Sequence, residues 1–103
     1  MMLDYLDKYN LTSEQIKDIE QALIERGENI EHYQYNPEII METLDLFADI
    51  GVTNIYGIMM IPSSIFHSTM RSLKNRINSY GNKEQLAKLL NEDAENLSLI
   101  GLI

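Results

Sequence analysis

Residues 36–53 read NPEIIMETLDLFADIGVT, and this stretch contains the start, the apolar face and the end of one α-helix. Asn36 suits the N-cap position, and Pro37 suits the first helical position because its missing N–H would have no partner there. Three apolar residues recur at helical spacing and line one face: Ile40, Leu44 and Phe47. Gly51 closes the helix, and Val52 can reach the last of those three in the contact of a Schellman ending.

The same signals recur on both sides of this helix. Upstream, Thr12 and Gln15 have the spacing of a capping box, and Gly27 suits a helix end. The helices expected from such signals begin near residues 2, 12, 36, 53, 63, 82 and 93, with 28–35 either one helical turn or an irregular connection. The longest of the later ones should run from about Ser63 to Tyr80. No convincing strand appears, so we predict an all-α fold of six to seven short helices. The predicted core comprises Leu6, Ile16, Ile19, Leu23, Leu44, Phe47, Ile58, Phe66, Leu73, Ile77, Leu86 and Leu89.

The length of 103 residues fits a single helical domain over 1–103, with acidic N-terminal helices in 1–35 and repeat-like units in 36–103. A shift of 31 residues aligns apolar positions of two units. The aligned pairs are Ile55 with Leu86, Ile58 with Leu89, Met59 with Leu90, and Phe66 with Leu97. A period of about 30 residues is typical of helical solenoids, so two or three stacked units are an alternative description of the C-terminal part.

Part of the chain resembles a known family. The stretch LDLFADIGVT at 44–53 is followed by an aliphatic and proline pattern: Ile55, Ile58, Met59, Pro62, Ile65 and Phe66. Together with LKNRI at 73–77, it is similar to the helical repeat of the mitochondrial transcription termination factor (mTERF) family, over about residues 41–100. The resemblance implies a curved helical array that binds nucleic acid on a basic concave face. This chain differs from the family in being acidic overall and in having room for only two or three units.

Charge is divided unevenly along the chain. The net charge is −8, from 16 acidic and 8 basic residues. Residues 1–49 carry −9 and residues 50–103 carry +1, and no acid occurs from Ile50 through Lys83. The two halves either attract each other, within the fold or between copies, or the basic segment meets a phosphate backbone. The candidate nucleic-acid-binding residues are Arg71, Lys74, Arg76, Lys83 and Lys88.

Several classes of chemistry lack their residues. The absence of Cys excludes disulfides, thiolate metal sites and a Cys nucleophile, and the five glycines stand singly rather than in a phosphate loop. Glu28 and His32 would share a helix face and could begin a metal site, but a solvated acidic surface is the simpler interpretation. We therefore expect no enzyme activity, no cofactor and no metal. The acidic, amphipathic start and the polar breaks in residues 50–70 predict a cytoplasmic protein without a membrane span.

Four tyrosines lie in the acidic half and are candidate partner-binding residues: Tyr5, Tyr9, Tyr33 and Tyr35. Tyrosine is enriched in binding surfaces, although the edge of a core explains the pattern equally well. The tail at 97–103 is apolar, so it either packs on its own domain or covers a partner or a second copy. We predict a non-catalytic intracellular protein-interaction or regulatory module that acts through an acidic, Tyr-bearing surface and self-associates as a homodimer. The alternative is a helical-repeat protein that binds nucleic acid through a basic helix face.

Overall fold

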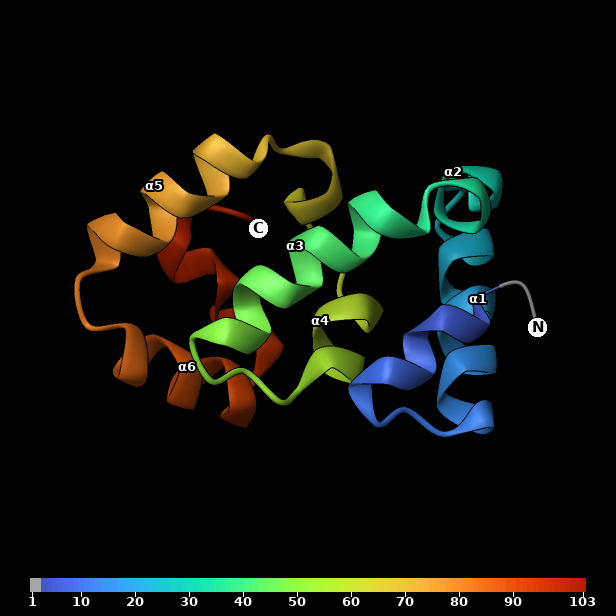
Figure 1. The fold of residues 1–103 in the computed structure, drawn as a ribbon, viewed down its shortest axis with the longest axis horizontal. Helices are drawn as coiled ribbons and strands as arrows, with labels where there is room; N and C mark the ends of the chain where they lie inside the picture. The colour runs from blue at the N-terminus through green and yellow to red at the C-terminus, as the bar shows by residue number, and fades with distance from the viewer. Residues whose placement is uncertain (1–2) are drawn as a thin grey trace.

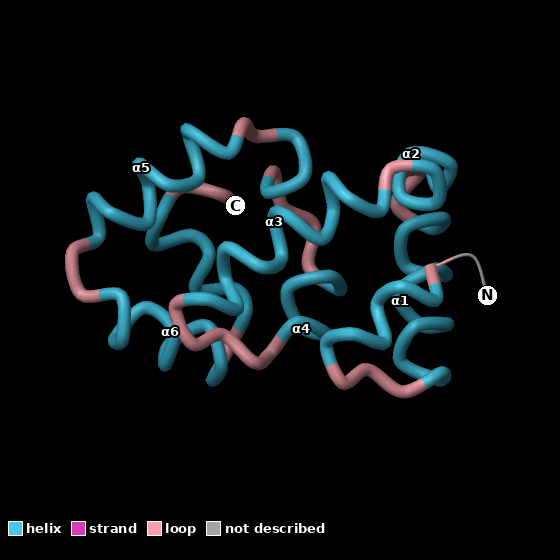
Figure 2. The backbone as a smooth tube through the Cα atoms, viewed as in Figure 1, coloured by secondary structure: helices cyan, strands magenta, loops and turns pink. Residues whose placement is uncertain are grey.

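The structure, a computed structural model, describes residues 3–103 and is built from helices (Figures 1 and 2). No strand occurs within this range, so the predicted all-α class is confirmed. Met2, which the sequence places on the first helix, lies outside the described residues. The elements are η1 (Asp4–Tyr9), α1 (Ser13–Glu25), α2 (Ile30–Tyr35), α3 (Pro37–Asp49), α4 (Ile55–Met60), η2 (Ile65–His67), α5 (Met70–Tyr80), α6 (Lys83–Glu92) and η3 (Ala94–Ile100), where η denotes a 3₁₀ helix.

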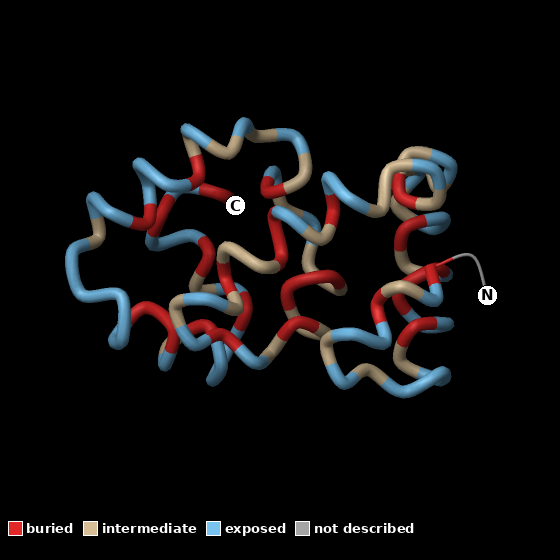
Figure 3. The backbone as a smooth tube through the Cα atoms, viewed as in Figure 1, coloured by how far each residue is buried: buried red, intermediate tan, exposed pale blue. Residues whose placement is uncertain are grey.

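The helices form two ends joined by α3 (Figure 1). The elements η1, α1 and α2 lie at one end, α5, α6 and η3 lie at the other, and α4 packs against α1 in between. The molecule measures 37 × 24 × 22 Å. Every helix contains buried positions (Figure 3), and the buried apolar side chains form one hydrophobic core cluster that includes residues from Leu3 to Leu102.

Side-chain caps start most of the helices, as the sequence predicts. The Thr12 hydroxyl accepts from the Gln15 amide at 3.1 Å, and the Gln15 side chain accepts from the Thr12 amide at 2.9 Å, which completes the capping box. Asn82 likewise accepts from the amide three residues on, at 3.0 Å. Asn36 differs, because its side chain donates to the His32 carbonyl and leaves the first turn of α3 without a side-chain cap.

The end of α3 has the hydrogen bonds of the predicted Schellman motif. The Val52 amide donates to the Phe47 carbonyl at 3.1 Å, and the Gly51 amide donates to the Ala48 carbonyl at 3.0 Å. Gly51 has a φ of +107°, a conformation that L side chains rarely adopt. The chain therefore reverses here and enters α4 immediately.

Two amide side chains hold the turn between α3 and α4 to α6. The Asn54 side chain donates to the Leu90 carbonyl at 3.0 Å, and Asn91 makes the other bonds. The Asn91 side-chain oxygen accepts from the backbone amides of Thr53 and Asn54, at 2.8 and 3.1 Å. The Asn91 side-chain nitrogen donates to the Gly51 carbonyl at 3.1 Å. Three backbone groups that belong to no helix thereby receive hydrogen-bond partners.

The expected continuous helix over 63–80 is wrong, because the structure divides it into η2 and α5. The Thr69 backbone is extended, with φ −72° and ψ 155°, and its hydroxyl accepts from the Ser72 amide at 3.0 Å. The Ser68 hydroxyl donates to the Ser64 carbonyl at 2.8 Å. Hydroxyl side chains that bond to nearby backbone compete with helix formation, so the break falls where two of them are adjacent.

Most of the predicted core is buried. Two of its residues, Phe66 and Leu89, are only partly buried and retain contact with solvent. The Phe66 and Tyr33 rings make a T-shaped pair with centroids 5.6 Å apart, and Phe66 packs against the core from its edge. The ten buried ones are Leu6, Ile16, Ile19, Leu23, Leu44, Phe47, Ile58, Leu73, Ile77 and Leu86.

The apolar tail packs on its own domain. Leu97, Ile100 and Leu102 are buried, and the Leu102 carbonyl accepts from the Ser64 amide at 3.0 Å. Arg76 donates from Nη1 to the Ile100 carbonyl at 3.0 Å. Of the two alternatives for the tail, docking on its own core holds for these residues, while two tail side chains stay about half exposed: Leu99 and Ile103.

Replacing Phe47 with alanine should lower the free energy of unfolding by about 3–5 kcal/mol, because the buried ring would leave a cavity. The same change at Phe66 should cost distinctly less, because solvent already reaches that side chain. Urea unfolding followed by circular dichroism measures both variants. Equal losses would mean that Phe66 belongs to the core as fully as Phe47.

Candidate functional site

Three of the four candidate tyrosines are engaged inside the protein. The Tyr5 hydroxyl donates to the Tyr33 carbonyl at 2.8 Å, and the Tyr9 hydroxyl donates to the Asp45 carboxylate at 2.8 Å. Tyr33 is 2% exposed. Burial raises the pKa of each of these three phenols, and for Tyr9 the hydrogen bond to Asp45 adds to the rise. Their polar atoms therefore hold η1, α2 and α3 together instead of facing a partner.

A carboxylate lies at the centre of the polar contacts between α1, α2 and η2. Glu28 accepts from the Tyr33 hydroxyl at 2.6 Å and from Nε and Nη2 of Arg26 at 2.9 and 2.7 Å. His67 Nε2 lies 3.6 Å from the same carboxylate. Burial raises the pKa of Glu28, but the hydrogen bonds from Tyr33 and Arg26 outweigh this effect, so its pKa lies below the ordinary value of 4.5.

Arg26 has a second set of acceptors beyond Glu28. Its Nη1 atom donates to the Met60 carbonyl at 3.0 Å and lies 3.5 Å from the Met59 carbonyl. These carbonyls belong to the last turn of α4, where backbone acceptors have no partner within the helix. The guanidinium was missed by sequence reasoning, because only the fold brings the end of α4 to the end of α1.

Glu28 with its neighbours Arg26, Tyr33 and His67, which we call the Glu28 cluster, borders an open cleft of about 530 Å³. His32 and His67 line the cleft, but Glu28 is already bonded on both oxygens. Within residues 3–103 no group of three or more His, Asp or Glu side chains is placed to hold a metal ion. The Glu28–His32 pair singled out in the sequence is therefore not part of such a group among those residues, although His67 also lies beside Glu28.

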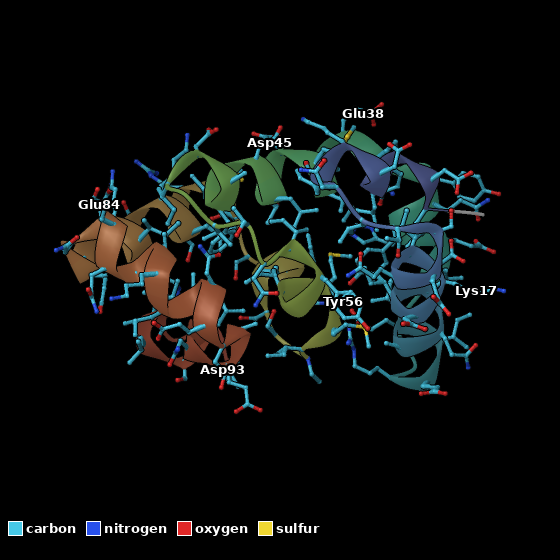
Figure 4. The ribbon with its side chains drawn as sticks, turned by 90° about the horizontal axis from the view of Figure 1, so that it is seen from below. Lys17, Glu38, Asp45, Tyr56, Glu84 and Asp93 are labelled. Atoms are coloured by element: carbon cyan, nitrogen blue, oxygen red, sulfur yellow. The ribbon has the colours of Figure 1, made fainter. Side chains whose placement is uncertain are left out.

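The fourth tyrosine lies at an exposed corner between α2 and α3, which we call the acidic corner and define as Tyr35, Glu38, Ile39 and Glu42. Tyr35 is 70% exposed and Ile39 is 52% exposed. Glu38 and Glu42 are exposed, and neither forms a hydrogen bond or an ion pair with any residue of 3–103. Figure 4 shows Glu38 and Asp45 pointing outward along the same edge of α3. The Asp45 carboxylate differs from its neighbours, because Lys8 pairs with it at 2.9 Å.

Sequence reasoning missed Ile39, although a signal for it exists. It falls beside the apolar stripe of α3 rather than on it, so the helical period alone predicts that its side chain points away from the core. A large apolar residue in that position, four residues after Tyr35 in the sequence, indicates an exposed surface rather than core packing.

The candidate basic residues divide between separate places. A groove of about 680 Å³ between α5 and η3 contains two of them, Arg71 and Arg76, and no acid lines it. We call this the α5–η3 groove, and its lining residues are Thr69, Arg71, Ser72, Asn75, Arg76, Ser79, Tyr80, Leu99 and Ile100.

The other three bases do not line this groove. Lys88 lies on α6 in a hollow that Glu84 and Glu92 also line, so carboxylates offset its charge. Lys74 and Lys83 are exposed, and neither is bonded to any residue of the described chain. The structure thus brings together only part of the basic set that the sequence suggests.

Comparison of the chain with protein-family models, curated proteins and solved structures finds no match. The resemblance of residues 41–100 to the termination factor repeat therefore stays a prediction, as does the 31-residue repeat. Among the described residues, no helix has the length and apolar character needed to cross a lipid bilayer.

The Glu28→Gln variant should be less stable than the wild type by about 1–3 kcal/mol at neutral pH, because it loses charge-assisted hydrogen bonds. The pKa of Glu28 is lowered in the folded state, so its stabilisation is fully present above about pH 4.5 and is lost as the pH falls below that value. Urea unfolding at a series of pH values should show the difference between the two proteins shrinking in acid. Glu42→Gln is the matched control, and a difference that persists unchanged in acid would contradict the assignment.

Proposed function

We propose that the chain is an intracellular, cytoplasmic, non-catalytic module that binds a protein partner through the acidic corner. The observation that carries the proposal is the exposure of Tyr35 and Ile39 together with the carboxylates of Glu38 and Glu42, which have no partner among residues 3–103. Aromatic and aliphatic side chains that stand exposed together are the usual anchors of binding surfaces. A partner that fits this corner presents an apolar pocket rimmed by basic side chains.

The other three candidate tyrosines support a binding surface that is limited to the acidic corner. The hydroxyls of Tyr5, Tyr9 and Tyr33 donate hydrogen bonds to acceptors within the protein. Removing these side chains would therefore lower the stability of the fold rather than act directly on partner binding. The Tyr35 hydroxyl forms no such bond with any of the residues that the structure describes. The acidic, Tyr-bearing surface of the proposal is therefore the acidic corner alone.

The Glu28 cluster supports a non-catalytic role. A general base needs an accessible lone pair and a pKa near the working pH. Glu28 instead accepts from Tyr33 and Arg26, and its pKa is lowered away from neutrality. The hydrogen bonds of Glu28 therefore support a structural role, in which its carboxylate joins Arg26 and Tyr33.

A second candidate function is nucleic-acid binding through the α5–η3 groove. The observation that favours it is the pair of guanidinium groups, Arg71 and Arg76, in a groove without carboxylates. Exposed Lys74 on the same helix could add a phosphate contact. The net charge of −8 opposes this function, because it repels a polyanion at long range.

The first test of the proposed function is partner capture by the acidic corner. The immobilised wild-type chain should retain a protein from a cell extract, and the Tyr35→Ser/Ile39→Ser variant should lose it because both apolar anchors are gone. The matched control is Ile24→Ser on α1, which removes a side chain of similar exposure, 50%, outside the corner. A titration with the purified partner must reproduce the loss, at least about tenfold in Kd. Equal binding by wild type and the double variant would refute the proposal.

The second test separates the two candidate functions. The proposed protein-binding module should give no fluorescence change with single- or double-stranded DNA or RNA at about 100 μM protein and low salt, where non-specific nucleic-acid binders reach saturation. A nucleic-acid binder would titrate, with a log–log salt slope of about −3 for three phosphate contacts. Arg71→Glu/Lys74→Glu would then abolish binding and Tyr35→Ser/Ile39→Ser would not. This variant pair leaves Arg76 in place because it holds the tail.

A further inference from the structure

The acidic corner and the α5–η3 groove are complementary, because both expose apolar side chains and their charges are of opposite sign. The corner offers two exposed apolar side chains, Tyr35 and Ile39, together with the carboxylates of Glu38 and Glu42. The groove offers apolar side chains beside two guanidinium groups, with no carboxylate among its lining residues. An apolar anchor with an acidic rim is the chemistry that such a groove would accept.

The charges on both surfaces lack partners within their own chain. Arg71 forms no hydrogen bond or ion pair with any residue of 3–103, and the same holds for Glu38 and Glu42. Arg76 uses Nε and Nη1 on Ser72 and on the carbonyls of the tail, while Nη2 has no partner among the described residues. Each surface therefore has charge-assisted hydrogen bonds still to make.

The two surfaces lie in opposite halves of the molecule. Figure 1 shows α2 and the start of α3 at one end and α5 with α6 at the other. One molecule cannot bring its own corner to its own groove, but a second copy can supply the missing surface. Resting on the proposed function of the corner, we infer that its partner is a second copy of this chain, which receives the corner in its α5–η3 groove.

Such a contact is head to tail, because two different surfaces meet. Each molecule in a pair keeps one unused corner or groove, so a pair can add further copies and the assembly grows with concentration. A stable contact needs about 1,000 Å² in total, which is about 500 Å² from each copy. The chain exposes 5787 Å², so the contact would use less than a tenth of its surface.

A second copy fits the groove better than a nucleic acid does. Leu99 is 50% exposed and contributes apolar area that a phosphate backbone would not cover. Salt is a poor probe of the contact, because it screens the attraction at the interface and also the repulsion between two molecules of charge −8. The test therefore uses variants that disable one surface each.

The experiment is sedimentation velocity of the full chain at concentrations up to about 1 mM, where weak contacts are populated. The groove variant is Arg71→Glu, and the corner variant is Tyr35→Ser/Ile39→Ser. The wild type should form species that grow beyond a dimer, and each variant alone should associate at least about tenfold more weakly. An equimolar mixture of the two variants has one intact corner and one intact groove, so it should form a heterodimer and nothing larger.

Two controls make the same kinds of change elsewhere. Lys17→Glu on α1 reverses one charge as Arg71→Glu does, and Ile24→Ser removes an exposed apolar side chain. Both controls should associate as the wild type does. All the substituted side chains are exposed, so circular dichroism should show an unchanged helical spectrum for each variant.

Three results would overturn the inference: a wild type that stays monomeric throughout, a wild-type dimer that does not grow, or a mixture of variants that does not associate. Binding of DNA or RNA that Arg71→Glu abolishes, without self-association, would also overturn it and assign the groove to nucleic acid. A different result decides the proposed function. A monomeric chain that captures another protein through Tyr35 and Ile39, with Arg71→Glu binding normally, would retain the proposed function and exclude the second copy as the partner.

Discussion

The Arg26 guanidinium is the contact on which the arrangement of the helices depends. It binds the Glu28 carboxylate with two nitrogens and the Met60 carbonyl with the third. Helix α4 has only six residues, so most of its carbonyls lack partners within the helix. One side chain at the end of α1 therefore supplies the missing donor for α4 and fixes the carboxylate that receives the Tyr33 hydroxyl. Helices α1, α2 and α4 are therefore positioned by these polar bonds as well as by the core that they cover.

The charge asymmetry of the sequence becomes a separation in space. The acidic first half forms η1, α1, α2 and α3, and the part without acids forms α4, η2 and α5. The halves do not neutralise each other extensively, since Lys8–Asp45 and Arg26–Glu28 both join residues of the acidic half. Within residues 3–103, the carboxylates of Glu38 and Glu42 on α3 and the guanidinium of Arg71 on α5 thus remain without partners. That distribution is what gives the molecule two distinct faces for recognition.

Features fixed by neighbours in the sequence were predictable. The Thr12–Gln15 capping box, the Asn82 cap and the Gly51 ending each depend on residues at most five apart. The break at Thr69 was not predicted, although it is local, because the apolar period continues through it and masks the two hydroxyl side chains. The helical period is a property of side-chain spacing and carries no information on which backbone groups a hydroxyl will bind.

The candidate site shows where such reasoning ends. Tyr33 and Tyr35 are two residues apart and chemically identical, yet one is 2% exposed and the other 70%. What separates them is the position of Glu28 and Phe66 around the first ring, and that position follows from the packing of whole helices. The α5–η3 groove likewise exists only after the tail has docked against α5 and Arg76 has bound its carbonyl.

The turn between α3 and α4 depends on a hydrogen-bond donor of the Asn91 side chain, and not only on the volume that this side chain fills. Its oxygen serves two backbone N–H groups, and its nitrogen serves the Gly51 carbonyl. An aspartate at this position would fill the same volume and keep both acceptor bonds, but it has no proton to donate when ionised. Its second oxygen would then face the Gly51 carbonyl oxygen, lone pair against lone pair. Slow hydrolysis of this one amide, which adds no bulk, would therefore loosen the joint between the two halves of the molecule as the protein ages.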